Sequence, residues 1–214
     1  MPADPAAPAV FRRRAAWALL IGVLVALAVA TLWSRRWGAP GTAAPPVLGT
    51  IPDFTFTERD GSRVSRADLA GEPWIAAFIF TRCGSICPRI TDQMIRLGTL
   101  MPHPELVRRV SFTVDPEYDT PQVLSAYARD HGIAPAATSR WLFLNGPESA
   151  LKSLVRNGFK LVVEKGDSPE DPILHSSRLV LVDGQGSVRG YYDAFDEEAI
   201  GRLLQDLRAL LRES

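Results

Sequence analysis

The chain has 214 residues, and its 24 lysines and arginines are balanced by 24 aspartates and glutamates, which gives a formal net charge of zero. Nucleic-acid binding needs a basic surface, so this balance argues against nucleic acid as a partner. Only two cysteines are present, Cys83 and Cys87, with three residues between them. The length allows one domain with a full core in addition to a short N-terminal segment.

The N-terminal segment predicts a membrane anchor. Ala15–Trp33 is a run of 19 residues without a charge, with arginines before and after it and tryptophans near both ends. At 1.5 Å per residue a helix of this length spans about 28 Å, close to the thickness of the hydrocarbon layer. We expect residues 1–14 in the cytoplasm and residues 15–33 to cross the inner membrane once. A cleaved signal peptide, with Ala28–Ala30 as the cleavage site, is the alternative.

Residues 34–49 contain Pro40, Pro45 and Pro46 among small residues and predict a linker. Residues 50–214 then form one domain on the periplasmic side. Because that compartment is oxidising, two cysteines without other partners are expected either to form a disulfide or to hold a metal.

The domain alternates predicted strands and helices. An apolar run predicts a buried strand at Trp74–Phe80, and the capping pattern Asp119-Thr120-Pro121 predicts the start of a helix. In chain order we predict a hairpin of Phe54–Phe56 and Arg63–Val64, strand Trp74–Phe80, helix Ile90–Leu100, strand Val107–Val114, helix Val123–His131, strand Trp141–Leu144, helix Pro147–Asn157, strand Phe159–Val163, strands Arg178–Asp183 and Val188–Tyr192, and helix Glu197–Leu211. This order indicates an α/β domain of three layers.

The two cysteines lie where a strand passes into a helix. Backbone amides and the helix dipole at such a junction favour the thiolate. If both cysteines were helical, their Cβ atoms would be about 5–6 Å apart, further than a disulfide allows, and the spacing would suit two thiolates on one metal. A redox dithiol remains open if Cys83 lies in the loop before the helix. Burial of both as core residues is the third alternative.

His175 is the candidate third ligand. It stands just before the strand Arg178–Asp183, which should neighbour the cysteine strand, and loops at such strand ends converge on one side of a sheet. Two thiolates and one imidazole would make a site for Cu(I), or for Cu(II) with one further ligand. We expect His103, between two prolines, and His131, at a helix end, to take no part in it.

These motifs together resemble the Sco/SenC family of membrane-anchored, thioredoxin-like copper proteins. The resemblance implies a central mixed sheet, and it implies that Cys83, Cys87 and His175 bind copper with Asp115 close by. Asp115 has an alternative role in ending a strand and accepting hydrogen bonds from loop amides. The matching stretches are Pro52-Asp53-Phe54, Phe80 to Cys83, Cys87-Pro88, Phe112 to Pro121 and His175 to Asp183.

The resemblance also implies a function. The protein is expected to be a copper metallochaperone, and in that role not an enzyme, which assembles the dinuclear copper centre of a haem–copper oxidase. Its partners would be the copper-accepting oxidase subunit and a copper donor or thiol reductase. Gly84 and Ser85 depart from the proline and acidic residue usual in the family, and neither change removes a ligand.

Two other functions remain as alternatives. A membrane-anchored thiol–disulfide oxidoreductase would reduce cysteines of the acceptor before the metal is loaded, but the spacing is CxxxC rather than CxxC. A peroxiredoxin would need threonine three residues before its reactive cysteine, where this chain has Phe80. A structural module without a site is the remaining interpretation.

Overall fold

The computed structural model describes residues 17, 19–31, 43–161, 163–165, 173–175 and 177–213. The chain divides into two units, Met1–Thr42 and Ala43–Ser214. In the first unit, residue 17 and residues 19–31 are helical, whereas the rest of the predicted anchor 15–33 lies outside the described residues. No helix formed by the described residues is both long enough and apolar enough to cross a membrane.

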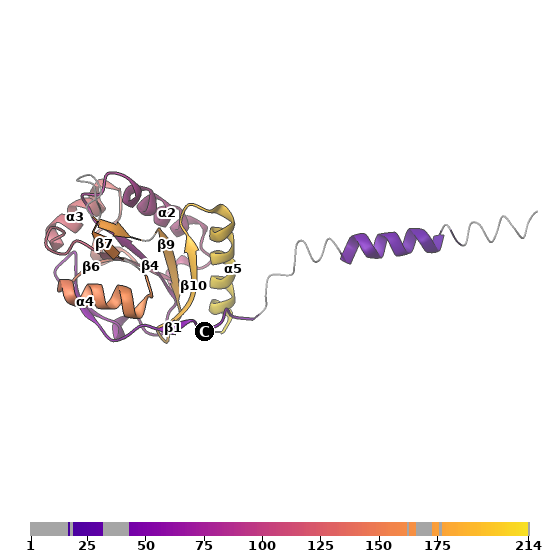
Figure 1. Ribbon diagram of the computed structural model, residues 1–214, viewed down its shortest axis with the longest axis horizontal. Helices are drawn as coiled ribbons and strands as arrows, with labels where there is room; N and C mark the ends of the chain where they lie inside the picture. The colour runs from indigo at the N-terminus through magenta and orange to yellow at the C-terminus, as the bar shows by residue number, and fades with distance from the viewer. Residues whose placement is uncertain are drawn as a thin grey trace, which may run out of the picture. The chain divides into compact units, whose positions relative to one another are not determined.

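The second unit is built on a mixed sheet of eight strands in the order β1-β10-β9-β4-β5-β6-β2-β3 (Figure 1). Strands β4, β5 and β6 are parallel, whereas β9 runs antiparallel to β4. The strands of the sheet are β1 Gly49–Thr50, β2 Thr55–Glu58, β3 Arg63–Ser65, β4 Trp74–Ile79, β5 Arg108–Thr113, β6 Trp141–Asn145, β9 Arg178–Val182 and β10 Ser187–Asp193, and β7 Val163–Lys165 and β8 Ile173–His175 form a separate hairpin.

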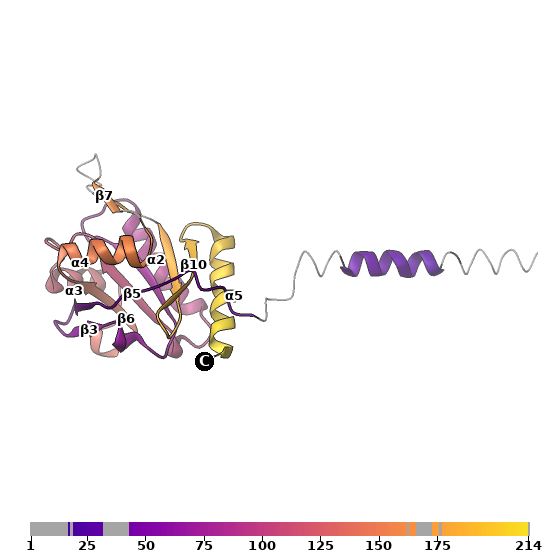
Figure 2. The same ribbon diagram turned by 60° about the horizontal axis from the view of Figure 1, so that its bottom comes forward.

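Helices cover both faces of the sheet, as the three-layer prediction requires. The α-helices are α2 Ile86–Leu100, α3 Pro121–Asp130, α4 Glu148–Ser153 and α5 Glu197–Glu213, with short helical turns at Ala67–Leu69, Pro104–Leu106, Ala136–Thr138 and Leu154–Gly158. Along β4, Ile75 and Ala77 face the core beneath α2, α3 and α5, whereas Ala76 and Phe78 face the core beneath α4. This alternation follows from the two-residue repeat of side chains along a strand. Both views show α5 beside β10 (Figures 1 and 2).

Most predicted elements are confirmed with small shifts at their ends. Helix α2 begins at Ile86 rather than Ile90, which places Cys87 in its first turn. Helix α3 begins after Thr120, whose hydroxyl oxygen accepts a hydrogen bond from the Val123 amide.

The predicted strand Phe159–Val163 is wrong. Helix α4 continues into a π-helical turn, Leu154–Gly158, and the Phe159 amide donates to the Leu154 carbonyl (3.0 Å). Phe159 and Leu161 are buried in the core beneath α4, and Lys160 between them adopts a positive φ of 53°. Two buried apolar residues separated by a polar one imitate the alternation of a strand, which explains the error.

Phe112 of β5 lies at the centre of the core beneath α4. Its ring stacks on Phe78 at 5.8 Å and meets Phe54 edge to face at 5.6 Å, and Phe159 lies 5.5 Å away. Aromatic pairs with this geometry stabilise a core beyond the area that they bury.

We therefore expect Phe112→Ala to lower the free energy of unfolding by about 3–5 kcal/mol, because a fully buried ring is replaced by a cavity. Denaturant unfolding followed by fluorescence measures this change. The matched control is Phe195→Ala, whose ring is 39% exposed and should cost about 1 kcal/mol or less. Equal losses in the two variants would contradict this account of the core.

Candidate metal centre

The two cysteines lie at the carboxyl end of β4, in and beside the loop that leads to α2. Cys83 is in the loop, and Cys87 is the second residue of the helix. The Cys87 amide donates to the Cys83 sulfur (3.4 Å), and the Phe80 amide donates to the Cys87 sulfur (3.4 Å). The backbone therefore brings the two sulfurs close together. Because Cys83 lies in the loop before the helix, a redox-active dithiol remains an alternative to a metal site.

Burial raises the pKa of the Cys87 thiol, and the hydrogen bond from the Phe80 amide only partly offsets this effect. The expectation that the helix start would favour a thiolate is therefore wrong for Cys87. The physical reason is desolvation, because Cys87 is fully buried in the core beneath α2, beside Ile90 and Met94. At neutral pH without metal, Cys87 is a protonated thiol.

A buried carboxylate, Asp119, fixes the loop that carries Cys83. It accepts hydrogen bonds from the Thr81 amide (3.2 Å), from the Thr81 hydroxyl (2.5 Å) and from the Thr113 hydroxyl (2.5 Å). The Asn145 side chain in turn donates to the Asp119 carbonyl (2.6 Å). Asp119 thus joins the cysteine loop to the end of β5, and burial raises its pKa against the effect of these hydrogen bonds.

Asp115 lies close to the cysteine loop, as the family resemblance implied. The Arg82 Nε donates to Asp115 Oδ2 (2.6 Å), and the Arg82 guanidinium also lies over the Tyr118 ring, 5.1 Å from its centre. Arg82 directly precedes Cys83 in the chain. The Asp115 carboxylate therefore positions Arg82, the neighbour of Cys83. The backbone amide of Asp115 donates to the Thr113 hydroxyl (3.0 Å).

The backbone of His175 ends β8, where it lies opposite Val163 of β7. Ala76 of β4 lies opposite Val180 of β9 in an antiparallel pair. The start of β9 and the end of β4 are therefore at the same end of the sheet. His175 precedes that start by three residues. The described side chains contain no group of three that could hold a metal, and the side chain of His175 is not among them.

The other two histidines lie where the sequence placed them. His131 follows α3, and its Nδ1 is 2.9 Å from the Tyr127 carbonyl. His103 is exposed and pairs with Glu105 through Nδ1 (3.2 Å).

Sequence reasoning missed two polar groups beside the cysteines. The sequence around Asp119 predicts only the start of a helix. The Tyr127 hydroxyl lies 2.7 Å from the Thr91 hydroxyl in the core that holds both cysteines, and burial raises its pKa. The helical repeat that buries Leu124 and Ala128 also predicts a buried Tyr127, but no sequence signal identifies its partner.

A thioredoxin-like α/β domain that presents a CxxxC pair at the end of its central strand defines a class of thiol and metal proteins. Within that class, the family model described as SCO1/SenC matches residues 44–212. The chain therefore belongs to the SCO1/SenC family.

Relatives and solved structures agree with this assignment. The SCO1 protein homolog of Bacillus subtilis is 34% identical over 77% of this chain and 84% of its own. A Stutzerimonas stutzeri protein named for copper binding is 30% identical over 67% and 69%. The structure of a SCO1/SenC family lipoprotein from Bacillus anthracis matches 79% of this chain and 99% of its own with a TM-score of 0.70 and 28% identity.

A further solved structure is that of BsSco, a member of the Sco family of cytochrome c oxidase assembly proteins in which a disulfide switch has been identified. It is 32% identical and covers 77% of this chain and 97% of its own, with a TM-score of 0.66.

Asp119→Asn tests the role of the buried carboxylate. Because the pKa of Asp119 in the folded state lies above its ordinary value of 3.8, ionisation disfavours folding. Its stabilising contribution is complete below about pH 4 and is lost as the pH rises through the folded pKa. We expect the free energy of unfolding of the wild type to fall relative to that of Asp119→Asn from pH 4 upwards, measured by urea unfolding.

The control is Asp130→Asn at the exposed end of α3, which should keep the pH profile of the wild type. A wild type that gained stability relative to Asp119→Asn as the pH rose would show instead that hydrogen bonding to the carboxylate outweighs its burial.

Proposed function

We propose that this protein is a copper-binding metallochaperone that serves the assembly of the dinuclear copper centre of a haem–copper oxidase. The observation that carries the proposal is the pair of sulfurs at the carboxyl end of β4, where the Cys87 amide donates to the Cys83 sulfur. Thiolates are ligands that copper, as a soft metal, prefers. The family supports the proposal, because one relative is named for copper binding and BsSco belongs to the oxidase assembly proteins.

Cys83, Cys87 and His175 are the proposed ligands. His175 ends β8, three residues before β9, and β9 begins at the end of the sheet where β4 leads into the cysteine loop. Asp115 is a weaker candidate for a fourth ligand, because its carboxylate already accepts a 2.6 Å hydrogen bond from Arg82. We assign it the positioning of the loop. Three ligands suit Cu(I), and Cu(II) would need a further donor.

Burial shapes how copper would be taken up and released. Because the Cys87 thiol is protonated in the free protein, binding of copper must release its proton. Copper is the cargo here, and it would leave by exchange of ligands with thiolates of the acceptor. Gly84 and Ser85 are exposed beside Cys83, so the acceptor can approach the site through the loop.

A thiol–disulfide reductase is the second candidate. In that reaction the two thiols become a disulfide, and two electrons and two protons pass to a disulfide of the acceptor, which becomes two thiols. The loop position of Cys83 favours this function because loop backbone can adjust to the geometry of a disulfide. The disulfide switch identified in BsSco supports it as well.

We also propose that residues 15–33 anchor the protein in the inner membrane, with the folded unit in the periplasm. The support is the sequence, which has 19 uncharged residues between arginines.

Copper titration tests the ligand set. The reduced protein should bind one copper, and the double variant Cys83→Ser, Cys87→Ser should lose stoichiometric binding. In His175→Ala the affinity should fall by about two orders of magnitude or more, with Cu(II) affected more than Cu(I), which tolerates two thiolates alone. Competition with a chelator of known affinity measures both changes.

His103→Ala is the matched control, because this exposed histidine lies outside the proposed ligand set, and it should bind copper as the wild type does. His175→Ala should also keep reversible oxidation of the two cysteines. If this variant fully restored oxidase activity in cells grown at low copper, dithiol chemistry rather than copper binding would be the function.

The anchor is tested by fractionation of cells. The full chain should remain with the membranes after alkaline or high-salt washing, because burial of apolar residues does not depend on ionic contacts. A chain that starts at Ala43 should appear in the soluble fraction. A mature N-terminus near Thr31 would instead show a cleaved signal peptide.

A further inference from the structure

A pocket of about 490 Å³ opens between the end of α2 and the end of α3. Arg109, the second residue of β5, and Trp141, the first of β6, lie in its wall. Because Arg109 lies opposite Ile75 near the start of β4, the pocket is at the opposite end of the sheet from the cysteine loop. Its volume lies within the range of about 300–1,000 Å³ that is typical of sites for small molecules.

Arg109 of this wall contacts an aromatic ring and a carbonyl oxygen in the described part of the structure. Its guanidinium lies 4.7 Å from the centre of the Trp141 ring, and its Nη1 donates to the Met94 carbonyl (2.9 Å). Among the described residues, the ion pairs do not include Arg109, whereas the neighbouring Arg108 and Arg140 both pair with Glu72. Burial lowers the pKa of Arg109, yet a guanidinium remains charged at any physiological pH.

The fold makes room for this cation. Gly98 is in the last turn of α2, and a Cβ there would lie 2.6 Å from Nη1 of Arg109. Glycine within a helix costs about 1 kcal/mol relative to alanine. The guanidinium is therefore held between the helix backbone and the Trp141 ring, whose Nε1 donates to the Ser111 hydroxyl (3.0 Å).

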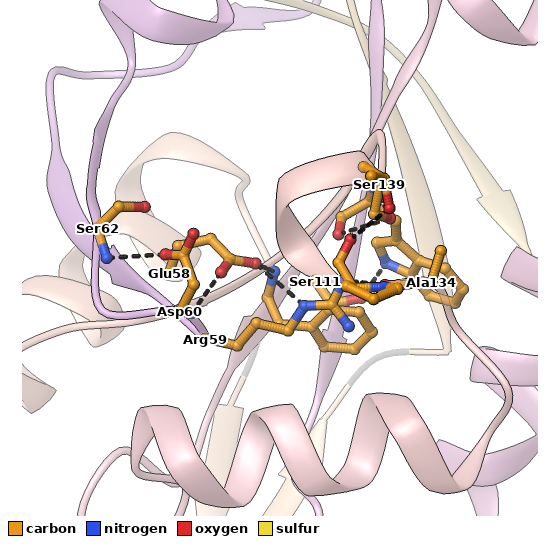
Figure 3. A network of polar contacts seen from close by, with 11 residues as sticks. Glu58, Arg59, Asp60, Ser62, Ser111, Ala134 and Ser139 are labelled. Carbon is orange, nitrogen blue, oxygen red and sulfur yellow. Dashed lines mark hydrogen bonds and ion pairs between the residues drawn. The ribbon is translucent and has the colours of Figure 1, made fainter.

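A second polar network fixes the chain that leads into β6, the strand that begins at Trp141. The Trp141 amide donates to the Ser139 hydroxyl (3.0 Å), and Arg59 donates to the carbonyl of Ala134, another residue of the pocket wall (2.7 Å). Figure 3 shows Ser139, Ser111 and Ala134 together, with Arg59 reaching toward them from the Glu58 side. The wall of the pocket is thus held in place before any ligand binds.

The chemistry of the wall defines the ligand. Among the described residues that line the pocket, Arg109 has no ion-pair partner, whereas Arg140 pairs with Glu72. The fork of N–H donors of a guanidinium suits a carboxylate. Glu105 also lines the pocket, and its carboxylate would oppose a dianion such as phosphate more strongly than a monoanion. Ile95, Ile133 and Pro104 supply apolar surface for the rest of the molecule.

We propose that this pocket binds a small organic monocarboxylate with an apolar body, held through Arg109. The site does not depend on the proposed copper function, because it lies at the other end of the sheet. It is a second ligand site on the domain.

Binding of benzoate to the full-length chain, measured by calorimetry and by ligand-observed NMR, tests the proposal. The wild type should bind benzoate at least tenfold more tightly than benzyl alcohol, which has the same ring without the charge, and more tightly than inorganic phosphate. Arg109→Gln should weaken benzoate binding at least tenfold. Arg202→Gln, which removes an exposed arginine of α5, should bind as the wild type does.

Thr138→Trp provides a second variant that keeps Arg109. Thr138 is an exposed residue of the pocket wall, so a large side chain there should block the pocket without disturbing the core, and benzoate binding should be lost. The proposal is overturned if the wild type does not bind benzoate, if it binds phosphate or benzyl alcohol equally well, or if Thr138→Trp binds benzoate as the wild type does.

Discussion

The buried carboxylate of Asp119 is the contact on which the geometry of the cysteine loop depends. It accepts from the amide and hydroxyl of Thr81, and so holds the first residues after β4 against the end of β5. The ion pair of Arg82 with Asp115 adds a second contact to this loop, which contains an exposed glycine and serine. An acceptor with several donors aimed at it also imposes one arrangement, because each donor left unpaired in the core would be costly.

Burial also determines the acidity of the Cys87 thiol. Cys87 lies in an apolar core, which raises the pKa of its thiol and opposes formation of the thiolate that a helix start would otherwise favour. A bound cation supplies the positive charge that desolvation makes valuable, so copper would stabilise the ionised pair far more than the protein alone does. Cys87 is therefore a neutral thiol in the absence of a metal.

The charged side chains at the two ends of the sheet have different kinds of partner. At the cysteine end, Asp115 is paired with Arg82 and Asp119 is surrounded by donors. At the other end, Arg109 has a carbonyl and an aromatic ring as its partners, together with the space left by Gly98. These contacts use only part of the hydrogen-bonding capacity of the guanidinium, and Arg109 is one of the residues that line the pocket.

Local sequence signals predicted much of the fold. The apolar run Trp74–Phe80 predicted the strand that is buried on both faces, and Thr120 followed by Pro121 predicted the start of α3. The cysteine spacing and the Asp-Pro-Glu and His-Ser-Ser motifs identified the family. Phe159 shows the limit of such signals, because a residue buried after a helical turn has the same apolar pattern as one in a strand.

What only the tertiary structure decided are contacts between residues far apart in the chain. Asp119 reads locally as a helix start, and its role appears only when β4 and β5 lie side by side. The desolvation of Cys87 depends on α2, α3 and α5 packing over one face of the sheet. Arg109, Gly98 and Trp141 come from three separate elements. Periodicity and capping are properties of neighbouring residues, whereas burial and charge balance are set by every group that folding brings within a few ångströms.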